Sequence, residues 1–284
     1  ITRLIIPSIS FLALHLLAEE PRTVDLIVKG DYVVTMNDSF QIIWKGAVAV
    51  DSGKIISVAP ISEIDGKYLA KKTLAGDGRI LMPGLVNGHS HAAMTLLRGI
   101  ADDLALDDWL NKYIFPVERA FVDSKFVRVG TELACWEMLR GGTTTFVDMY
   151  YHPETIASVV EGCGIRALIS ATVIDQKSPD ANDADESLKN GERFIRAWHD
   201  KQPRIIPIFG PHANYTLSTD QLRATRDAAN RLGAPISIHM AESMFEVDFS
   251  REKYGMSSVS MFDSIYFFLF VLLFGVFMIL IMII

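Results

Sequence analysis

The sequence predicts an α/β fold, a (β/α)8-type barrel that is incomplete after about five strands and is preceded by a small N-terminal β-sandwich. Strand-like and helix-like segments alternate from Met82 onward, which is typical of parallel sheets. No glycine-rich nucleotide-binding loop follows the first of these strands, which favours a barrel over a doubly wound sheet. Four of the seven histidines fall at predicted strand ends, where barrels gather their functional groups.

The composition excludes several classes of protein. The chain has 284 residues, a formal net charge of −7 and 50% hydrophobic residues. It carries no run of Lys or Arg, so we expect no nucleic-acid partner. The two cysteines, Cys135 and Cys163, lack the C-x-x-C spacing, and we therefore expect no disulfide framework.

Shifts in composition divide the chain into an apolar leader (1–22), a β-rich segment (23–82), a strand–helix segment (83–264) and an apolar tail (265–284). The leader resembles the core of a secretory signal that ends near Ala18; the alternative is translated sequence upstream of the true start. The expected location is cytoplasmic, or exported if the leader is a signal peptide.

The segment from Thr23 to Ile80 reads as β structure. Two short strand-like runs, 25–28 and 32–34, are separated by Lys29-Gly30-Asp31. Further on, the run 47–50 is followed by a turn containing Gly53 and by a second run, 55–58, which predicts a hairpin. Several short strands with turns between them favour a small sandwich over helices.

The strand–helix segment is predicted element by element from its hydrophobic periodicity and its end signals. After the strand that leads into His89, the predicted strands are 143–150, 166–174, 204–209 and 234–239. The predicted helices are 125–139, 153–161 (closed by Gly162), 187–198, 218–232 (stopped by Gly233) and 244–254. Alternation of this kind implies a parallel sheet.

The most informative stretch is LMPGLVNGHSH, residues 81–91. His89 and His91 are two residues apart on an extended segment, so their side chains point to the same side. Two neutral imidazoles placed in this way can chelate a metal at about 2.0–2.1 Å. The other interpretation is two polar residues in a turn after Pro83-Gly84. Asp148, His212 and His239 also follow predicted strands.

His239 can supply a third metal ligand, and Glu242 follows it by three residues. In a continued strand this odd offset would put Glu242 on the opposite face. The chain must therefore leave the strand after His239, which the small Ala241 permits. A carboxylate beside a metal site can carry a proton between water and a leaving group. The alternative is a first-turn helix glutamate favoured by the helix dipole.

Several motifs occur together in a recognisable order and spacing. They are PGLVNGHSHAAMTLLRGIADDLALDDWL (83–110), Pro116-Val117-Glu118, GGTTTFVDMYYH (141–152), GPHANYTLS (210–218) and ISIHMAES (236–243). On these motifs the chain resembles the metal-dependent amidohydrolase superfamily, in the branch of methylthioadenosine/S-adenosylhomocysteine deaminases and chlorohydrolases. The resemblance implies a barrel with a small β-sandwich, one catalytic zinc (iron in some relatives), and hydrolytic removal of an amino or chloro group from an aromatic ring.

The resemblance also implies roles for individual residues. It implies that His89, His91 and His239 are zinc ligands and that Glu242 is the proton shuttle. It further implies that His212 contacts the substrate and that Glu118 is similar to the glutamate that holds the nucleoside ribose. The expected activity is zinc-dependent hydrolytic deamination of an adenosine-type nucleoside. The alternatives are a triazine or other heterocycle chlorohydrolase or deaminase, and a non-catalytic, membrane-associated relative.

The family pattern calls for two further ligands, a histidine ending the sixth strand and an aspartate ending the eighth. No histidine follows His239, and from Tyr266 the chain continues for nineteen uncharged residues. We therefore expect a truncated or frame-shifted copy with negligible turnover as written. A membrane partner is expected only if the tail is genuine, since nineteen apolar residues can just span a bilayer. Assembly into a homo-oligomer is left open.

Overall fold

The computed structural model describes residues 20–265, so all but residues 20–22 of the predicted leader and all but Ile265 of the predicted tail lie outside the described residues. The chain divides into two compact units, Ile1–Pro83 and Gly84–Ile284. Within residues 20–265, no helix is both long enough and apolar enough to cross a membrane.

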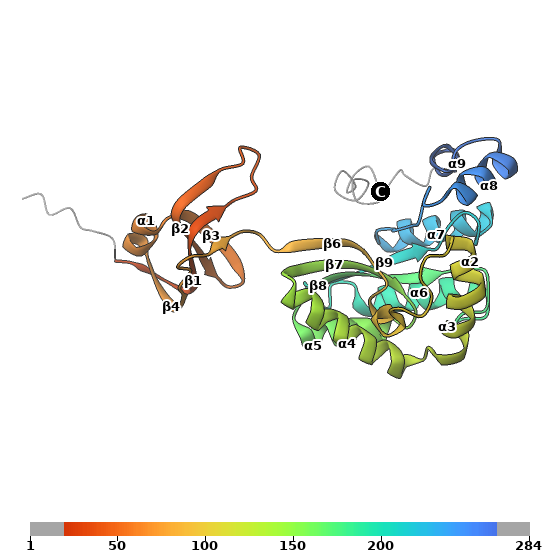
Figure 1. Cartoon of the computed structure of the whole chain (residues 1–284), viewed down its shortest axis with the longest axis horizontal. Helices are drawn as coiled ribbons and strands as arrows, with labels where there is room; N and C mark the ends of the chain where they lie inside the picture. Colours follow the sequence, from red (N-terminus) through yellow and green to blue (C-terminus); the bar gives the residue numbers. More distant parts are fainter. Residues whose placement is uncertain (1–19, 266–284) are drawn as a thin grey trace, which may run out of the picture. The chain divides into compact units, whose positions relative to one another are not determined.

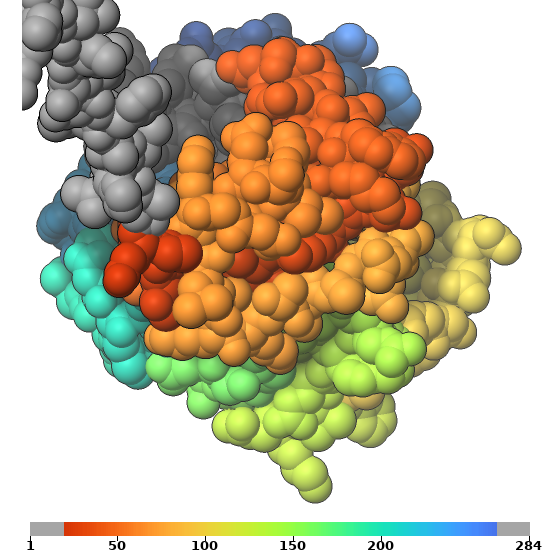
Figure 2. Space-filling view, turned by 90° about the vertical axis from the view of Figure 1, so that its left-hand side faces the viewer, coloured from red at the N-terminus to blue at the C-terminus, as the bar shows by residue number. Residues whose placement is uncertain are grey.

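The N-terminal unit is a mixed β-sheet with one short helix, drawn in red to orange in Figures 1 and 2. Its elements are β1 (Arg22–Val34), β2 (Ile42–Asp51), β3 (Lys54–Pro60), α1 (Ile61–Lys67), β4 (Tyr68–Leu74) and β5 (Ile80–Leu81). The strand order is β3-β2-β1-β4, and β5 pairs with β1. Val24, Ile27, Ala47, Ala49 and Ile64 form its buried core.

The predicted hairpin is confirmed, because β2 and β3 pair in antiparallel register around Ser52-Gly53. The prediction of two runs broken at Lys29-Gly30-Asp31 is wrong, because β1 continues through them with Gly30 opposite Gly46. The charges are accommodated by ion pairs, with Lys29 2.8 Å from Asp65. All five strands belong to one hydrogen-bonded sheet, whereas the sequence predicted a sandwich.

The C-terminal unit is built on a parallel sheet of four described strands in the order β6-β7-β8-β9. The strands are β6 (Leu85–Ser90), β7 (Thr143–Tyr150), β8 (Arg166–Val173) and β9 (Ile205–Pro211). The helices that follow them are α4 (Ser124–Arg140), α5 (Pro153–Cys163), α6 (Ala184–Trp198), α7 (Thr219–Leu232), α8 (Met244–Tyr254) and α9 (Ser258–Ser264). Helices α4 to α7 pack along the sheet (Figure 1) over buried residues that include Phe146, Ile169 and Phe209.

Local signals placed most of these elements correctly. Strand β7 and helix α8 have the predicted bounds. Helix α7 opens with a capping box between Ser218 and Gln221 and stops at Gly233. Helix α5 continues past Gly162 and ends at Gly164, whose φ of +78° provides the left-handed turn.

The predicted fifth strand, 234–239, is wrong as a regular strand. Its backbone joins β9 through hydrogen bonds from Phe209 N to Pro235 O and from Ser237 N to Phe209 O, both 2.9 Å. The two segments share one isolated bridge, between Phe209 and Ile236. Pro235 has no N–H to donate, which shortens the ladder. The segment still runs beside β9 and delivers His239 to the same end of the sheet.

The segment between β6 and α4 contains helical structure that the sequence did not predict. A 3₁₀ turn, η1 (Ala92–Leu97), follows β6 directly. Next come α2 (Leu106–Asp108), a π-helical segment η2 (Trp109–Ile114) and α3 (Phe115–Phe121), which run on without a break. A π-helical turn inside a helix is rare and often lies at a functional site. Here it lies between Trp109 and Glu118, which both line the cavity described below.

Candidate metal centre and active site

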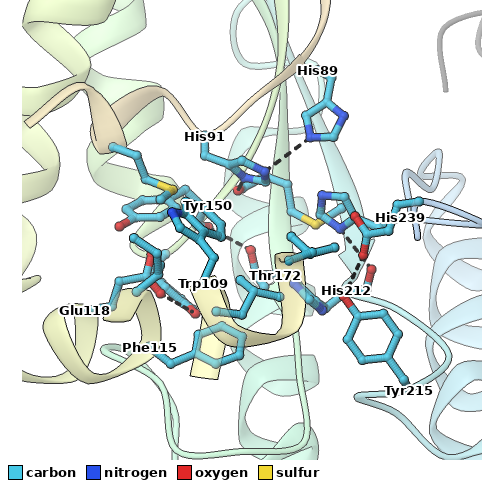
Figure 3. A pocket seen from close by; sticks show the side chains of 17 residues that line it. His89, His91, Trp109, Phe115, Glu118, Tyr150, Thr172, His212, Tyr215 and His239 are labelled. Carbon is cyan, nitrogen blue, oxygen red and sulfur yellow. Dashed lines mark hydrogen bonds between the residues drawn. The ribbon is translucent and has the colours of Figure 1, made fainter. Parts of the chain in front are cut away.

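The three histidines predicted as metal ligands converge at the C-terminal ends of the strands (Figure 3). His89 and His91 come from the end of β6 and from the residue after it, and His239 comes from the segment beside β9. One ring nitrogen from each lies within 4.8 Å of the others. The Nε2 atoms of His89 and His91 are 3.2 Å apart.

Backbone carbonyls fix the orientation of two of these rings. His91 Nδ1 lies 2.7 Å from the carbonyl oxygen of Met149, and His239 Nδ1 lies 3.0 Å from that of His212. A carbonyl only accepts, so each Nδ1 carries the hydrogen and each Nε2 keeps its lone pair. Burial, reinforced by neighbouring imidazoles, lowers the pKa of His91 and of His239 to about 4. Both rings are therefore neutral at neutral pH, which is the form in which an imidazole can bind a metal.

This arrangement fits a zinc ion. Two ligands at about 2.0–2.1 Å from a tetrahedral zinc lie about 3.3 Å apart, close to the observed 3.2 Å between His89 and His91. At this distance a His89 Nε2–H can donate to His91, and in the other His89 tautomer both Nε2 lone pairs can bind one shared cation. A ligating histidine commonly donates its other N–H to a carbonyl or a carboxylate, as His91 and His239 do here.

Glu242 reaches the same cavity because the chain turns sharply after His239. Ala241 has a φ of +56°, which confirms the predicted departure from the strand. The Tyr215 hydroxyl donates a hydrogen bond of 2.5 Å to Glu242 Oε1. The Glu242 backbone N–H donates to Glu246 Oε2 at 2.9 Å. Tyr215 thus orients the Glu242 carboxylate, and Glu246 holds the Glu242 backbone in the turn.

Glu118 lies on α3 and is only 3% exposed. The Tyr151 hydroxyl donates to its Oε2 at 3.3 Å. Burial raises the pKa of Glu118 to about 7, against the opposing effect of the Tyr150 and Tyr151 hydroxyls. A buried carboxyl group whose pKa is this far above its usual range is typical of a functional site.

His212 follows directly after β9. Its Nδ1 lies 3.1 Å from Thr216 Oγ1, and its ring centroid is 5.0 Å from that of His239. Burial, with His239 and His91 nearby, lowers its pKa well below the usual range. The ring is therefore a neutral hydrogen-bonding group beside the three-histidine cluster.

One cavity of about 290 Å³ brings together the six residues to which the family resemblance gives roles, whereas Asp148 does not line it. Its remaining lining is largely apolar and aromatic and includes Met94, Trp109, Phe115, Tyr150 and Tyr215. Sequence reasoning missed Tyr215, although it lies in the GPHANYTLS motif three residues after His212. Among the described residues, no arginine lines this cavity.

Known proteins similar to this chain fall into one group. The chain is 42% identical over 245 residues to the 5'-deoxyadenosine deaminase of Methanosarcina mazei, covering 86% of this chain and 55% of that protein. It is 41% identical over 224 residues to the 5-methylthioadenosine/S-adenosylhomocysteine deaminase of Thermodesulfovibrio yellowstonii, covering 78% and 51%. The chain thus spans about half the length of the curated relatives it matches.

Solved structures share the fold of this chain. An adenosine deaminase from Xanthomonas campestris with bound zinc superimposes with a TM-score of 0.83 at 37% identity, covering 87% of this chain and 56% of that chain. The zinc-complexed atrazine chlorohydrolase of Arthrobacter aurescens TC1 has a TM-score of 0.74 at 18% identity, covering 84% and 58%, which supports the likeness in fold alone. Residues 80–268 match the Amidohydrolase family, and the chain belongs to that family.

Proposed function

We propose that the protein is a zinc-dependent hydrolase that removes the amino group from an adenosine-type nucleoside. The observation that carries the proposal is the convergence, in one cavity, of three histidines, an oriented carboxylate and a second, buried carboxyl group. The curated relatives named above, 5'-deoxyadenosine and methylthioadenosine/S-adenosylhomocysteine deaminases, support the nucleoside assignment over a triazine.

His89, His91 and His239 would hold the metal through their Nε2 atoms. Bound zinc supplies Lewis-acid activation at a hydrolytic site. The all-nitrogen donor set suits zinc, and imidazole also suits iron, so iron is the second candidate for the same position.

Glu242 is the residue to which we assign proton transfer. Its Oε1 already accepts the hydrogen bond from Tyr215, which leaves Oε2 to carry the proton. In the overall reaction, a C–O bond forms and a C–N bond breaks at the amino-bearing ring carbon. Ammonia leaves with one proton of the water, and the other proton ends on the product ring. A carboxylate positioned for such transfers typically contributes about 10²–10⁴-fold to the rate.

We assign Glu118 and His212 to binding the nucleoside. Glu118 lies among aromatic side chains on the side of the cavity formed by α3 (Figure 3). Its carboxyl group can accept hydrogen bonds from sugar hydroxyls. His212 lies beside His239, where a neutral imidazole can hydrogen-bond a ring nitrogen. The flat Trp109 and Phe115 rings offer surfaces on which a purine can stack.

The test is ammonia release from 5'-deoxyadenosine by the zinc-loaded chain, compared with release of chloride or amine from a triazine. Glu242→Gln should reduce nucleoside turnover by at least about 10²-fold without loss of nucleoside binding. Glu252→Gln is the matched control, because Glu252 lies on α8 and does not line the cavity. Equal activity of the two variants would contradict the role of Glu242.

Nucleoside binding to the zinc-loaded chain is measured separately, by calorimetry. Ammonia release above the rate without protein would contradict the negligible turnover expected from the sequence, and the comparison of E242Q with E252Q is made on that activity. Without ammonia release, zinc-dependent nucleoside binding alone tests the substrate class. Failure of the zinc-loaded chain to bind any adenosine-type nucleoside, with triazine binding retained, would refute the proposed substrate class.

A further inference from the structure

Strand β7 accepts hydrogen bonds from three consecutive residues around His91. The Ser90 hydroxyl lies 2.7 Å from the carbonyl oxygen of Val147. The carbonyl oxygen of Met149, two residues along β7, accepts the His91 ring N–H. Between these two contacts lies Asp148, whose Oδ1 accepts the backbone N–H of Ala92 at 2.6 Å.

The Asp148 contact replaces a missing part of the backbone ladder. The register between β6 and β7 shifts between Asn87 and Ser90, and the last backbone pairing is Ser90 with Asp148. Beyond that point the strand gives way to the 3₁₀ turn η1, so Ala92 N–H has no strand partner. The Asp148 carboxylate accepts this N–H in place of a strand carbonyl.

The contact with Ala92 is the main hydrogen bond of Asp148. Ser90 Oγ also lies 3.2 Å from Asp148 Oδ1. Its single hydrogen favours the closer Val147 carbonyl. Asp148 Oδ2 is buried with no hydrogen-bond partner among residues 20–265. Burying a carboxylate oxygen without a hydrogen bond costs free energy, so we expect Asp148 to have a role beyond packing.

We propose that Asp148 is a positioning residue for the metal centre. By holding the Ala92 N–H, it fixes the main chain on the C-terminal side of His91, while Met149 fixes the ring itself. Together they set the direction in which His91 Nε2 points. The inference rests on the metal centre within the proposed function and is independent of the substrate.

The test measures metal binding alone, with no nucleoside present. Asp148→Ala should weaken zinc binding, measured by competition with a chromophoric chelator, by about 10–100-fold, as is typical when the partner of a ligand is lost. It should also change the visible absorption of the Co²⁺-loaded protein, which reports ligand geometry. Asp148→Asn retains an acceptor for Ala92 and should stay within about threefold of wild type.

Ser170→Ala is the matched control, because Ser170 is fully buried on the neighbouring strand opposite Met149 and its hydroxyl has no partner among the described residues. It should leave the zinc affinity and the Co²⁺ spectrum unchanged. If D148A does not fold, Asp148→Ser, which is polar but too short to reach Ala92, takes its place with the same expected loss. Wild-type affinity and an unchanged spectrum in the folded D148A or D148S protein would overturn the inference. A tenfold loss in D148N would do the same. If D148A loses zinc affinity as expected but the zinc-loaded wild-type chain binds no adenosine-type nucleoside, the proposed function fails and the positioning role of Asp148 stands.

Discussion

Replacing Glu118 with glutamine should stabilise the protein at alkaline pH while weakening nucleoside binding. Most substitutions of buried residues destabilise a protein, so the expected gain is unusual. It follows from the position of Glu118, which is 3% exposed and has the Tyr151 hydroxyl as its neighbour. Glutamine keeps the shape of the side chain and an acceptor oxygen, but it has no charge to bury.

The magnitude follows from the shift in the pKa of Glu118, from 4.5 to about 7 on burial. Each unit of pKa is worth about 1.4 kcal/mol, so the ionised form is disfavoured in the folded protein by about 3 kcal/mol. Because the folded pKa lies above the unfolded one, the stability contributed by Glu118 is fully present below pH 4.5. It is lost as the pH rises through about 7.

Glutamine does not ionise, so Glu118→Gln escapes this loss. The difference in free energy of unfolding between variant and wild type should be small at pH 5. It should rise mainly between pH 5 and pH 7 and level off at about 3 kcal/mol by pH 8. The pKa of Asp148 is also raised to about 7 by burial, but this group is present in both proteins and cancels from the difference.

Urea unfolding followed by tryptophan fluorescence measures the effect, since three of the four tryptophans (Trp109, Trp136 and Trp198) lie in the C-terminal unit. Glu137→Gln is the control, because Arg98 lowers the pKa of that glutamate and no gain at pH 8 is expected. The reasoning fails if E118Q differs from wild type by the same amount at pH 5 and pH 8.

E118Q should also weaken nucleoside binding by about 1.5–3 kcal/mol, because the proposed hydrogen bond from the nucleoside to the Glu118 carboxylate loses its charged acceptor.

Three further predictions concern the scaffold and the metal. Gly130→Ala should destabilise the protein by about 1–3 kcal/mol, because a Cβ there would lie 2.3 Å from the Ala93 carbonyl oxygen. Gly162→Ala, in open space on α5, should instead stabilise it by about 0.5–1 kcal/mol. Thermal unfolding of the two variants measures both changes. His239→Ala should reduce zinc affinity by at least about 10²-fold in chelator competition, and unchanged stoichiometric binding would exclude it as a ligand. His212→Ala should leave zinc affinity near wild type and weaken nucleoside binding, because only its backbone carbonyl supports His239.

The sequence was sufficient wherever short-range signals decide the structure. The helix opened by Ser218 and closed by Gly233 is set by a capping box and a left-handed terminus, both of which depend on nearest neighbours. The same holds for β7, whose buried apolar run has clear ends. Placing His89 and His91 at a strand end required only strand alternation and one apolar run.

Contacts between distant parts of the chain could not be predicted from such short-range signals. The hydrogen bond between Tyr215 and Glu242 joins residues 27 apart and depends on how the loop after β9 meets the turn at Ala241. The π-helical segment at Trp109–Ile114 has no periodicity of its own to reveal it. The segment 234–239 has strand-like composition, but Pro235 and a single bridge to β9 leave it irregular.

The geometry of the site depends on the register of the sheet more than on side chains reaching across the cavity. His91 is oriented by a carbonyl at the end of β7, and His239 by the carbonyl of His212 just after β9. A slip of one residue between β6 and β7 would move the Met149 carbonyl by about 3.3 Å and reverse its side chains. The packing of Phe146 and Ile169 in the core resists that slip. His212 therefore acts through two separable groups, since its backbone carbonyl orients His239, a proposed metal ligand, while its ring lines the cavity in which we propose that the nucleoside binds.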